Sequence, residues 1–274
     1  MSRITTAVLP VAGLGSRVMP LTLHQPKGMI GIVDRPIIHY VIDEILEAGI
    51  RHIIFVISPG HHQFKKYLDY LNKKDSEWRK LKLKFDFVVQ KKPRGNGDAI
   101  YLCRKLLGNR PFLVTFGDDI LADKKPPLKK MVELFHKAQA PILALEKVPK
   151  SQVFKYGVVK ASSFSAGLYK IEDVVEKPKV KDAPSNLTII GRYVLTADIL
   201  KQLSRLYPYR GKEIWLADAI KNHALSGGGV YGWLFKGERF DGGSKLGILK
   251  AQAYFGSLHK EFGPEFRKYL RSIR

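Results

Sequence analysis

Short apolar runs alternate with helix-like segments through the first half of the chain. The expected strands cover residues 7–11, 53–57, 85–89, 112–116 and 142–145, and the expected helices lie at 34–48, 61–71, 98–107 and 128–138. The second of these strands, Ile53–Ile57, is apolar at every position. Such a strand suits the centre of a parallel sheet that is covered by helices on both faces. The alternation predicts an α/β fold, with a doubly wound and mostly parallel sheet.

The first expected helix has recognisable ends. Asp34 stands near the N-cap, Pro36 falls in the first turn, and Gly49 comes just after the last apolar residue. Proline at the start and glycine past the end are typical of a helix. The strands on either side of this helix are therefore expected to lie parallel in the sheet.

From Tyr156 the pattern changes to short strands joined by polar turns. Strands are expected at 156–161, 168–175 and 187–194, and they predict a small antiparallel insertion that covers one edge of the sheet. Helices at 197–206 and 214–224, a strand at 230–235 and helices from about residue 245 complete the chain. No repeat or flexible linker interrupts its 274 residues, which predicts one domain, 1–274.

Charge is the unusual part of the composition. Lysine and arginine exceed aspartate and glutamate by 22, which attracts polyanions. The lysine runs are short and spread along the chain, and no nucleic-acid signature accompanies them, so we expect a basic surface rather than a specific nucleic-acid site. The single cysteine, Cys103, excludes an internal disulfide. No segment reaches the apolar length of a membrane span or forms a signal peptide, and we expect a cytoplasmic protein.

The first strand runs into a glycine turn, Ala12-Gly13-Leu14-Gly15-Ser16-Arg17. Two glycines let main-chain N–H groups approach an anion, and Arg17 offers a charged fork to phosphate oxygens. The turn is not a dinucleotide fingerprint, because the third glycine is replaced by Val18, and it lacks the Gly-Lys-Ser/Thr of a Walker loop. An ordinary strand-to-helix turn is the alternative.

Carboxylates follow two further strands, at Gly117-Asp118-Asp119 and at Asp241-Gly242-Gly243. Side chains alternate along a strand, so only one of the adjacent pair, Asp118 and Asp119, is expected to face a site. Carboxylates at strand ends suit Mg²⁺, which takes one or two of them together with phosphate oxygens. The alternative for either corner alone is a turn or a helix cap.

Eight motifs in order along the chain resemble the bacterial UTP–glucose-1-phosphate uridylyltransferases (UDP-glucose pyrophosphorylases), within the sugar-1-phosphate nucleotidyltransferases. They are Pro10–Arg17, Pro26–Lys27, Gly117–Asp119, Tyr156–Val159, Val175–Pro178, Pro184–Leu187, Gly191–Tyr193 and Asp241–Gly247. The resemblance covers almost the whole chain and implies a Rossmann-like, glycosyltransferase-A-like fold. It also implies a nucleotide-binding part of about 1–150 and a sugar-phosphate-binding part of about 151–245, before C-terminal helices at about 245–274.

The resemblance implies that nucleotide is bound by Ala12, Gly13 and Gly15 in the first loop and by Gln90 and Gly95, which contact the uracil. The implied charged residues are Arg17 and Lys27 on the triphosphate and Lys177 on the sugar phosphate, which act in catalysis. The implied sugar ligands are Gly157, Glu176 and Asn186, and the implied Mg²⁺ ligands are Asp118 and Asp241.

The implied reaction transfers uridylyl from UTP to glucose 1-phosphate, giving UDP-glucose and pyrophosphate. A homodimer or homotetramer is implied as well. Tyr254, Phe255 and Phe262 are candidate contacts, although packing in the core explains them equally well. The alternatives are thymidylyl transfer or another sugar phosphate, a non-catalytic nucleotide-binding relative, and a nucleic-acid binder. The chain departs mildly from the family pattern at Ser16, which replaces Thr. It departs more strongly at five positions, where Leu23 replaces Lys, Gly28 replaces Glu, Gly31 replaces Pro, Trp215 replaces Gln and Ala217 replaces Thr.

Overall fold

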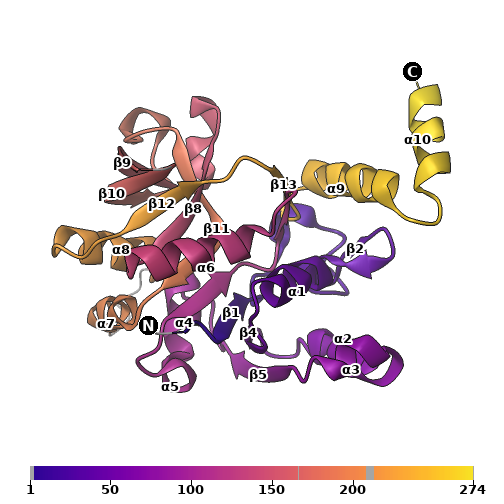
Figure 1. Cartoon of the computed structure of the whole chain (residues 1–274), viewed down its shortest axis with the longest axis horizontal. Helices are drawn as coiled ribbons and strands as arrows, with labels where there is room; N and C mark the ends of the chain where they lie inside the picture. The colour runs from indigo at the N-terminus through magenta and orange to yellow at the C-terminus, as the bar shows by residue number, and fades with distance from the viewer. Residues whose placement is uncertain (1–2, 166, 208–212, 274) are drawn as a thin grey trace.

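A computed structural model describes residues 3–165, 167–207 and 213–273 (Figure 1). The last residue of the expected C-terminal helical segment, Arg274, lies outside this part. The strands are β1 (Thr6–Pro10), β2 (Gly31–Ile32), β3 (Arg35–Pro36), β4 (His52–Ile57), β5 (Lys84–Val89), β6 (Phe112–Thr115), β7 (Asp119–Ala122), β8 (Ile142–Lys147), β9 (Gly157–Ser165), β10 (Leu168–Glu176), β11 (Leu187–Leu195), β12 (Tyr231–Leu234) and β13 (Glu238–Asp241). The helices are α1 (Ile37–Glu47), α2 (Gln63–Lys74), α3 (Ser76–Lys80), α4 (Asn96–Leu102), α5 (Arg104–Leu107), α6 (Pro127–Ala138), α7 (Ala197–Arg205), α8 (Leu216–Leu225), α9 (Lys245–Leu258) and α10 (Gly263–Ser272).

Nine strands form the main sheet, in the order β5-β4-β1-β6-β11-β8-β12-β10-β9. The first four are parallel to one another, and β8 and β12 are also parallel. From β1 the chain proceeds outward to β4 and β5 and then returns to β6 on the other side of β1. This reversal leaves a crevice at the carboxyl ends of β1 and β6, which is where open α/β sheets bind ligands.

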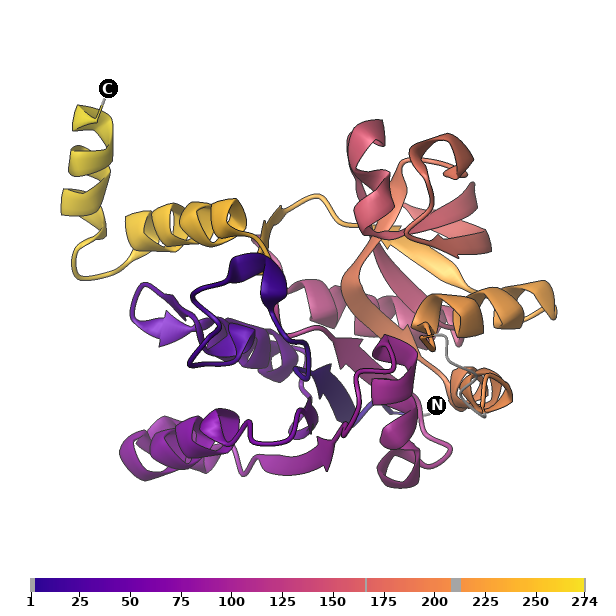
Figure 2. The ribbon, with the colours of Figure 1, turned by 180° about the vertical axis from the view of Figure 1, so that it is seen from behind.

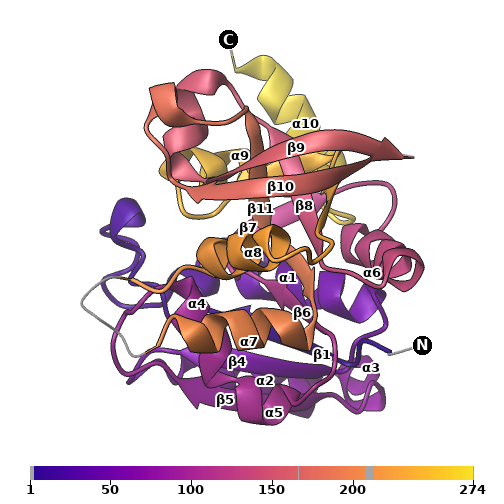
Figure 3. The same ribbon diagram turned by 90° about the vertical axis from the view of Figure 1, so that its left-hand side faces the viewer.

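Helices cover both faces of the sheet; in Figure 3 the strands run across the view, with α7 and α8 in front of the sheet and α1 behind it. Alternate residues of β1 enter different cores: Ala7 and Leu9 pack on the side of α1, α2 and α6, whereas Val8 packs on the side of α4, α7 and α8. The apolar strand Ile53–Ile57 is divided between the cores in the same way. The doubly wound α/β prediction is therefore confirmed.

The expected insertion at 156–194 is only partly at an edge. β9 and β10 lie at the end of the sheet, but β11 lies in its middle, antiparallel to both β6 and β8. All nine residues of β11 are buried, which explains its central position. The expected edge location was therefore wrong for this strand.

The boundaries of some helices also differ from the prediction. α1 begins at Ile37 rather than near Asp34, because Arg35 and Pro36 pair with β2 as a short strand. The helix expected at 61–71 continues to Lys74 and is followed by α3, which Asp75 caps through its side chain.

Two short strands that the sequence analysis did not predict form a separate antiparallel pair, β7 with β13. This pair joins the end of β6 to the segment before α9, and α9 and α10 then extend away from the sheet (Figure 2). Among the described residues, none of the helices combines the length and apolar character needed to cross a membrane.

Candidate active site

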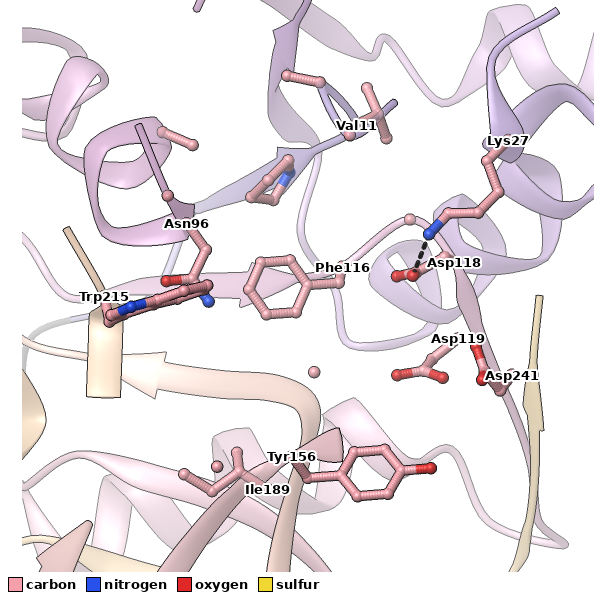
Figure 4. Close-up of a pocket in the computed structure, with 18 of the residues that line it drawn as sticks. Val11, Lys27, Asn96, Phe116, Asp118, Asp119, Tyr156, Ile189, Trp215 and Asp241 are labelled. Carbon is pink, nitrogen blue, oxygen red and sulfur yellow. Dashed lines mark hydrogen bonds and ion pairs between the residues drawn. The ribbon is translucent and has the colours of Figure 1, made fainter. Parts of the chain in front are cut away.

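A cavity of about 430 Å³ opens at the carboxyl ends of β1, β5 and β6 (Figure 4). Eleven of the thirteen residues singled out from the sequence line it, and they are Ala12, Gly13, Arg17, Lys27, Gln90, Gly95, Asp118, Gly157, Glu176, Lys177 and Asp241. Gly15 and Asn186 are not among the described residues that line it. The tertiary structure thus brings segments from both halves of the chain to one cavity.

The glycine turn after β1 forms one wall. Its main chain is fixed because the hydroxyl of Ser58 donates to the Ala12 carbonyl at 2.6 Å and that of Thr22 donates to the Gly15 carbonyl at 3.0 Å. Gly15 has a φ of 65°, and a Cβ there would lie 2.8 Å from a methyl group of Thr22. Gly15 therefore shapes the turn from behind, whereas Ala12 and Gly13 face the cavity.

Gln90 follows β5 and is buried. Its amide nitrogen donates to the Gly95 carbonyl at 3.1 Å and to the Asp98 carboxylate at 2.7 Å, and Asp98 also accepts a hydrogen bond from Tyr207. The amide is held in one orientation by these bonds. Because both N–H groups of the amide are donated within the protein, its oxygen is the atom that can accept a hydrogen bond from a flat group such as a base.

The β7–β13 pair places acids that are far apart in sequence side by side. Asp119 and Asp241 are opposite each other in its register, and the N–H of Gly242 donates to the Asp118 carbonyl at 2.7 Å. The N–H of Gly243 donates to the Asp241 carboxylate. Figure 4 shows Asp118, Asp119 and Asp241 together at one end of the cavity.

Both adjacent carboxylates line the cavity, so the expectation that only one would do so was wrong. The alternation rule does not apply because β6 ends at Thr115 and β7 begins at Asp119, which leaves Asp118 between two strands.

Lys27 lies 2.5 Å from Asp118. Burial alone would raise the pKa of Asp118, but the charge and hydrogen bond of Lys27, with a contribution from Arg17, outweigh burial and lower it. The Asp118 carboxylate is therefore ionised at neutral pH and able to bind a cation.

Arg239 is a cavity residue that the sequence analysis missed. Its guanidinium donates to Asp119 at 3.1 Å, to Glu146 at 2.8 Å and to the Tyr156 hydroxyl at 3.1 Å. Burial raises the pKa of Asp119 to about 6, although Arg239 opposes the rise. The sequence did contain a clue to Arg239: it stands two residues before Asp241 on the same short strand, and such residues point to the same face.

The opposite wall comes from the start of β9 and the end of β10, where Gly157 and Glu176 pair. A Cβ at Gly157 would lie 3.1 Å from the Glu176 carboxylate, so the missing side chain leaves room for that acid. Burial raises the pKa of Glu176, and the charge of Lys177 only partly offsets it. The Lys177 N–H donates to the Tyr156 carbonyl at 3.0 Å, which continues the β9–β10 pairing beyond Glu176.

Asn186 is exposed, and its amide donates to the Val148 carbonyl at 3.3 Å. In this structure it therefore supports the start of β11 rather than lining the cavity. Of the five stronger departures from the family pattern, Gly28 and Trp215 line the cavity, whereas Leu23 and Gly31 are exposed and Ala217 is buried in the core.

Residues 6–255 match the family model for nucleotidyl transferases. The chain is 36% identical to a putative UTP–glucose-1-phosphate uridylyltransferase from Methanocaldococcus jannaschii, over 98% of each chain. It is 33% identical to a UTP–glucose-1-phosphate uridylyltransferase from Bacillus subtilis, over 100% of this chain and 98% of the relative.

Solved structures agree with these relatives. A UDP-glucose pyrophosphorylase complexed with UDP-glucose is similar at a TM-score of 0.86 and 36% identity, over 94% of this chain and 100% of the other. A UTP-bound UGPase from Acinetobacter baumannii is similar at a TM-score of 0.86 and 33% identity, over 99% of this chain and 100% of the other. The resemblance that the eight motifs indicate is confirmed, and the chain belongs to the nucleotidyl transferase family, among relatives that are named as UTP–glucose-1-phosphate uridylyltransferases.

Proposed function

We propose that this enzyme transfers uridylyl from UTP to glucose 1-phosphate and releases pyrophosphate. The observation that carries the proposal is one shared cavity, which has a phosphate-type turn and a fixed glutamine amide on one side and the Glu176–Lys177 corner on the other. The acids of the β7–β13 pair lie between these two sides. The relatives that share the fold over full length are named for this reaction or were solved with its substrate or product.

The acids at the end of the cavity fit Mg²⁺. Mg²⁺ keeps several waters and uses one or two protein carboxylates with substrate phosphates. Asp118 and Asp241 supply two carboxylates next to space for a ligand, and the described residues contain no cluster of three or more His, Cys, Asp or Glu side chains that would form a closed metal centre. We propose these two as the ligands. The bound ion would offset charge on the phosphates of the nucleotide.

The protein needs to position two anions and to reduce their repulsion. The phosphate of glucose 1-phosphate is largely ionised at neutral pH, with a second pKa of about 6, so no general base is needed. Its oxygen forms a bond to the α-phosphorus of UTP, while the bond from that phosphorus to the bridging oxygen breaks and pyrophosphate departs with the electron pair. Arg17 and Lys27 are proposed to hold the triphosphate, and Lys177 the attacking phosphate.

The other assignments follow from the same placement. Ala12 and Gly13 bring main chain to the nucleotide, with Gly15 shaping the turn, and Gln90 and Gly95 receive the uracil. Gly157 and Glu176 receive the hexose. Asn186 remains a proposed hexose ligand only if its loop moves toward the cavity on binding. The nucleotide part, about 1–150, and the sugar-phosphate part, about 151–245, are proposed parts of one domain, because their strands share one sheet.

The proposal is tested by incubating the purified protein and Mg²⁺ with each nucleoside triphosphate and several sugar 1-phosphates, and by measuring pyrophosphate. We expect the largest kcat/KM for UTP with glucose 1-phosphate. A preference for thymidine triphosphate or another sugar would change the assigned substrates, and no release with any pair would contradict an enzymatic role.

We also propose a homodimer or homotetramer. The support is that α10 extends from the body and that Leu249 and Leu258 of α9 are exposed (Figure 2). Tyr254 and Phe255 are not free for this role, because they pack within the chain against Phe240. Sedimentation of the wild type and of Leu249→Glu tests the proposal, and a monomeric wild type would contradict it.

A further inference from the structure

Lys177 has a fixed main chain and a long side chain. Its φ of 46° lies in the left-handed region, which few residues with a Cβ adopt. Its side chain is about half exposed, and a lysine stem lets the ammonium reach many positions. To meet a phosphate in one geometry, the ammonium needs a contact that limits these positions.

Two groups provide such contacts. The ammonium lies 3.7 Å from the Glu176 carboxylate and 4.2 Å from the centre of the Trp215 ring. An aromatic face attracts a cation at this distance but carries no net charge. The indole can therefore hold Lys177 in place without neutralising it, so the ammonium keeps its charge for an anion.

Trp215 is itself held by the loop on the nucleotide side of the cavity. The Gly97 N–H donates to the Ile214 carbonyl at 2.9 Å, and the Leu216 N–H donates to the Asn96 side chain at 2.8 Å. These bonds fix the main chain on both sides of Trp215. Figure 4 shows Asn96 and Trp215 together on one wall.

We propose that Trp215 is a positioning residue, which holds the Lys177 ammonium where the phosphate of the sugar substrate binds. The inference rests on the proposed function, because it takes Lys177 as a phosphate ligand. The resemblance described above implies a glutamine at this position, and a glutamine offers no aromatic face. The indole therefore gives this chain a contact that the pattern lacks.

Replacing the ring separates this role from a structural one. Trp215→Leu is expected to lower kcat/KM for glucose 1-phosphate by about three- to tenfold, the size of a cation–π contact at a partly exposed site. KM for UTP is expected to change by less than about twofold, because Trp215 acts through Lys177. Trp215→Phe keeps an aromatic face and is expected to recover most of the loss.

The decisive comparison uses Lys177→Met, which removes the charge but keeps most of the stem. If Trp215 acts through Lys177, Trp215→Leu has less than about a twofold further effect in the Lys177→Met enzyme. The same loss in both backgrounds would overturn the proposal and indicate a direct contact between the indole and substrate. An unchanged Trp215→Leu enzyme would also overturn it. Thermal unfolding of each variant checks that all are folded.

The contact between Trp215 and Lys177 can be tested even if the proposed uridylyl transfer is wrong. If the wild type releases no pyrophosphate with any substrate pair, calorimetric binding of glucose 1-phosphate to the wild type, Trp215→Leu and Lys177→Met still tests the contact. Weaker binding in both variants supports positioning, and equal binding in wild type and Trp215→Leu overturns it.

Discussion

Two of the acid–base groups among the described residues, one in the core and one in the cavity, differ in their surroundings. In the core, Glu44 of α1 accepts hydrogen bonds from Arg192 of β11 at 2.8 and 3.0 Å, and the Arg192 side chain is 0% exposed. In the cavity, Lys27 and Asp118 form a pair whose side chains are 18% and 25% exposed. The first group is enclosed by protein, and the second faces the space proposed for substrates.

The pKa shifts reflect this difference. Burial raises the pKa of Glu44, although Arg192 opposes the rise. At Asp118 burial also acts to raise the pKa, but the positive charges of Lys27 and Arg17 prevail and lower it. Asp118 therefore has more positive charge around it than Glu44 does, which suits a carboxylate beside phosphates and a metal ion.

The two groups are connected through the main chain. The guanidinium of Arg192 also donates to the carbonyls of Phe116 and Asp119, on either side of Gly117 and Asp118. The core pair thus supports the loop that presents the cavity acid. We infer that changes in the core group mainly alter stability, whereas changes in the cavity group mainly alter activity.

Arg192→Met is expected to have the largest effect. It leaves the Glu44 carboxylate buried without its cation, and the free energy of unfolding is expected to fall by about 3–5 kcal/mol in urea denaturation. Replacing Glu44 with Leu in the same chain should restore part of the loss, because no buried charge then remains. If the free energy of unfolding of Arg192→Met fell by less than about 1 kcal/mol, the core pair would not be more important for stability than the cavity pair.

Asp241→Asn is expected to lower kcat/KM by about 100- to 1,000-fold, because it removes a charged ligand of the proposed Mg²⁺. Its free energy of unfolding should stay within about 1 kcal/mol of the wild type. Asp123→Asn is the matched control, since Asp123 is exposed just after β7. A chelator should abolish wild-type activity and Mg²⁺ should restore it; activity that persists with the chelator would contradict the metal assignment.

Lys27→Met is expected to lower kcat/KM by about 10- to 100-fold, the size of one lost charged hydrogen bond. Steady-state kinetics with varied UTP measures the effect. Lys65→Met, on the exposed face of α2, removes the same charge outside the cavity and should leave the kinetics unchanged. Equal losses in the two variants would mean that overall charge, rather than the cavity contact, matters.

The two glycines of the first turn, Gly15 and Gly13, should show the same separation between an effect on stability and an effect on activity, with smaller magnitudes. Gly15→Ala is expected to lower the free energy of unfolding by about 1–2 kcal/mol, because of its positive φ and the nearby Thr22 methyl group. Gly13→Ala adds a Cβ with no atom within 4 Å, so we expect little loss of stability but a higher KM for UTP. If Gly13→Ala instead lowered stability and Gly15→Ala raised the KM for UTP, the wrong glycine would have been assigned to the cavity.

Much of the site was predictable because its residues follow strands. Parallel strands end at one edge of a sheet, so Ala12, Gln90 and Asp118 were expected to be near one another, and they line the same cavity. Arg239 was missed because β13 was not expected, so its position two residues before Asp241 on that strand was not used. Asn186 does not line the cavity, and its role as a hexose ligand stays a prediction, because its motif indicates a family but not the direction of one side chain.

The sequence by itself determined the local structure: apolar residues on both faces made Ile53–Ile57 a strand covered on both faces, second from the edge of the sheet, and helical periodicity located most of the helices. Only the tertiary structure decided that β11 enters the middle of the sheet and that β7 pairs with β13, which brings Asp119 beside Asp241. Periodicity reports which faces of a segment are buried but not which distant segment lies beside it. That choice depends on packing the whole chain around its two cores.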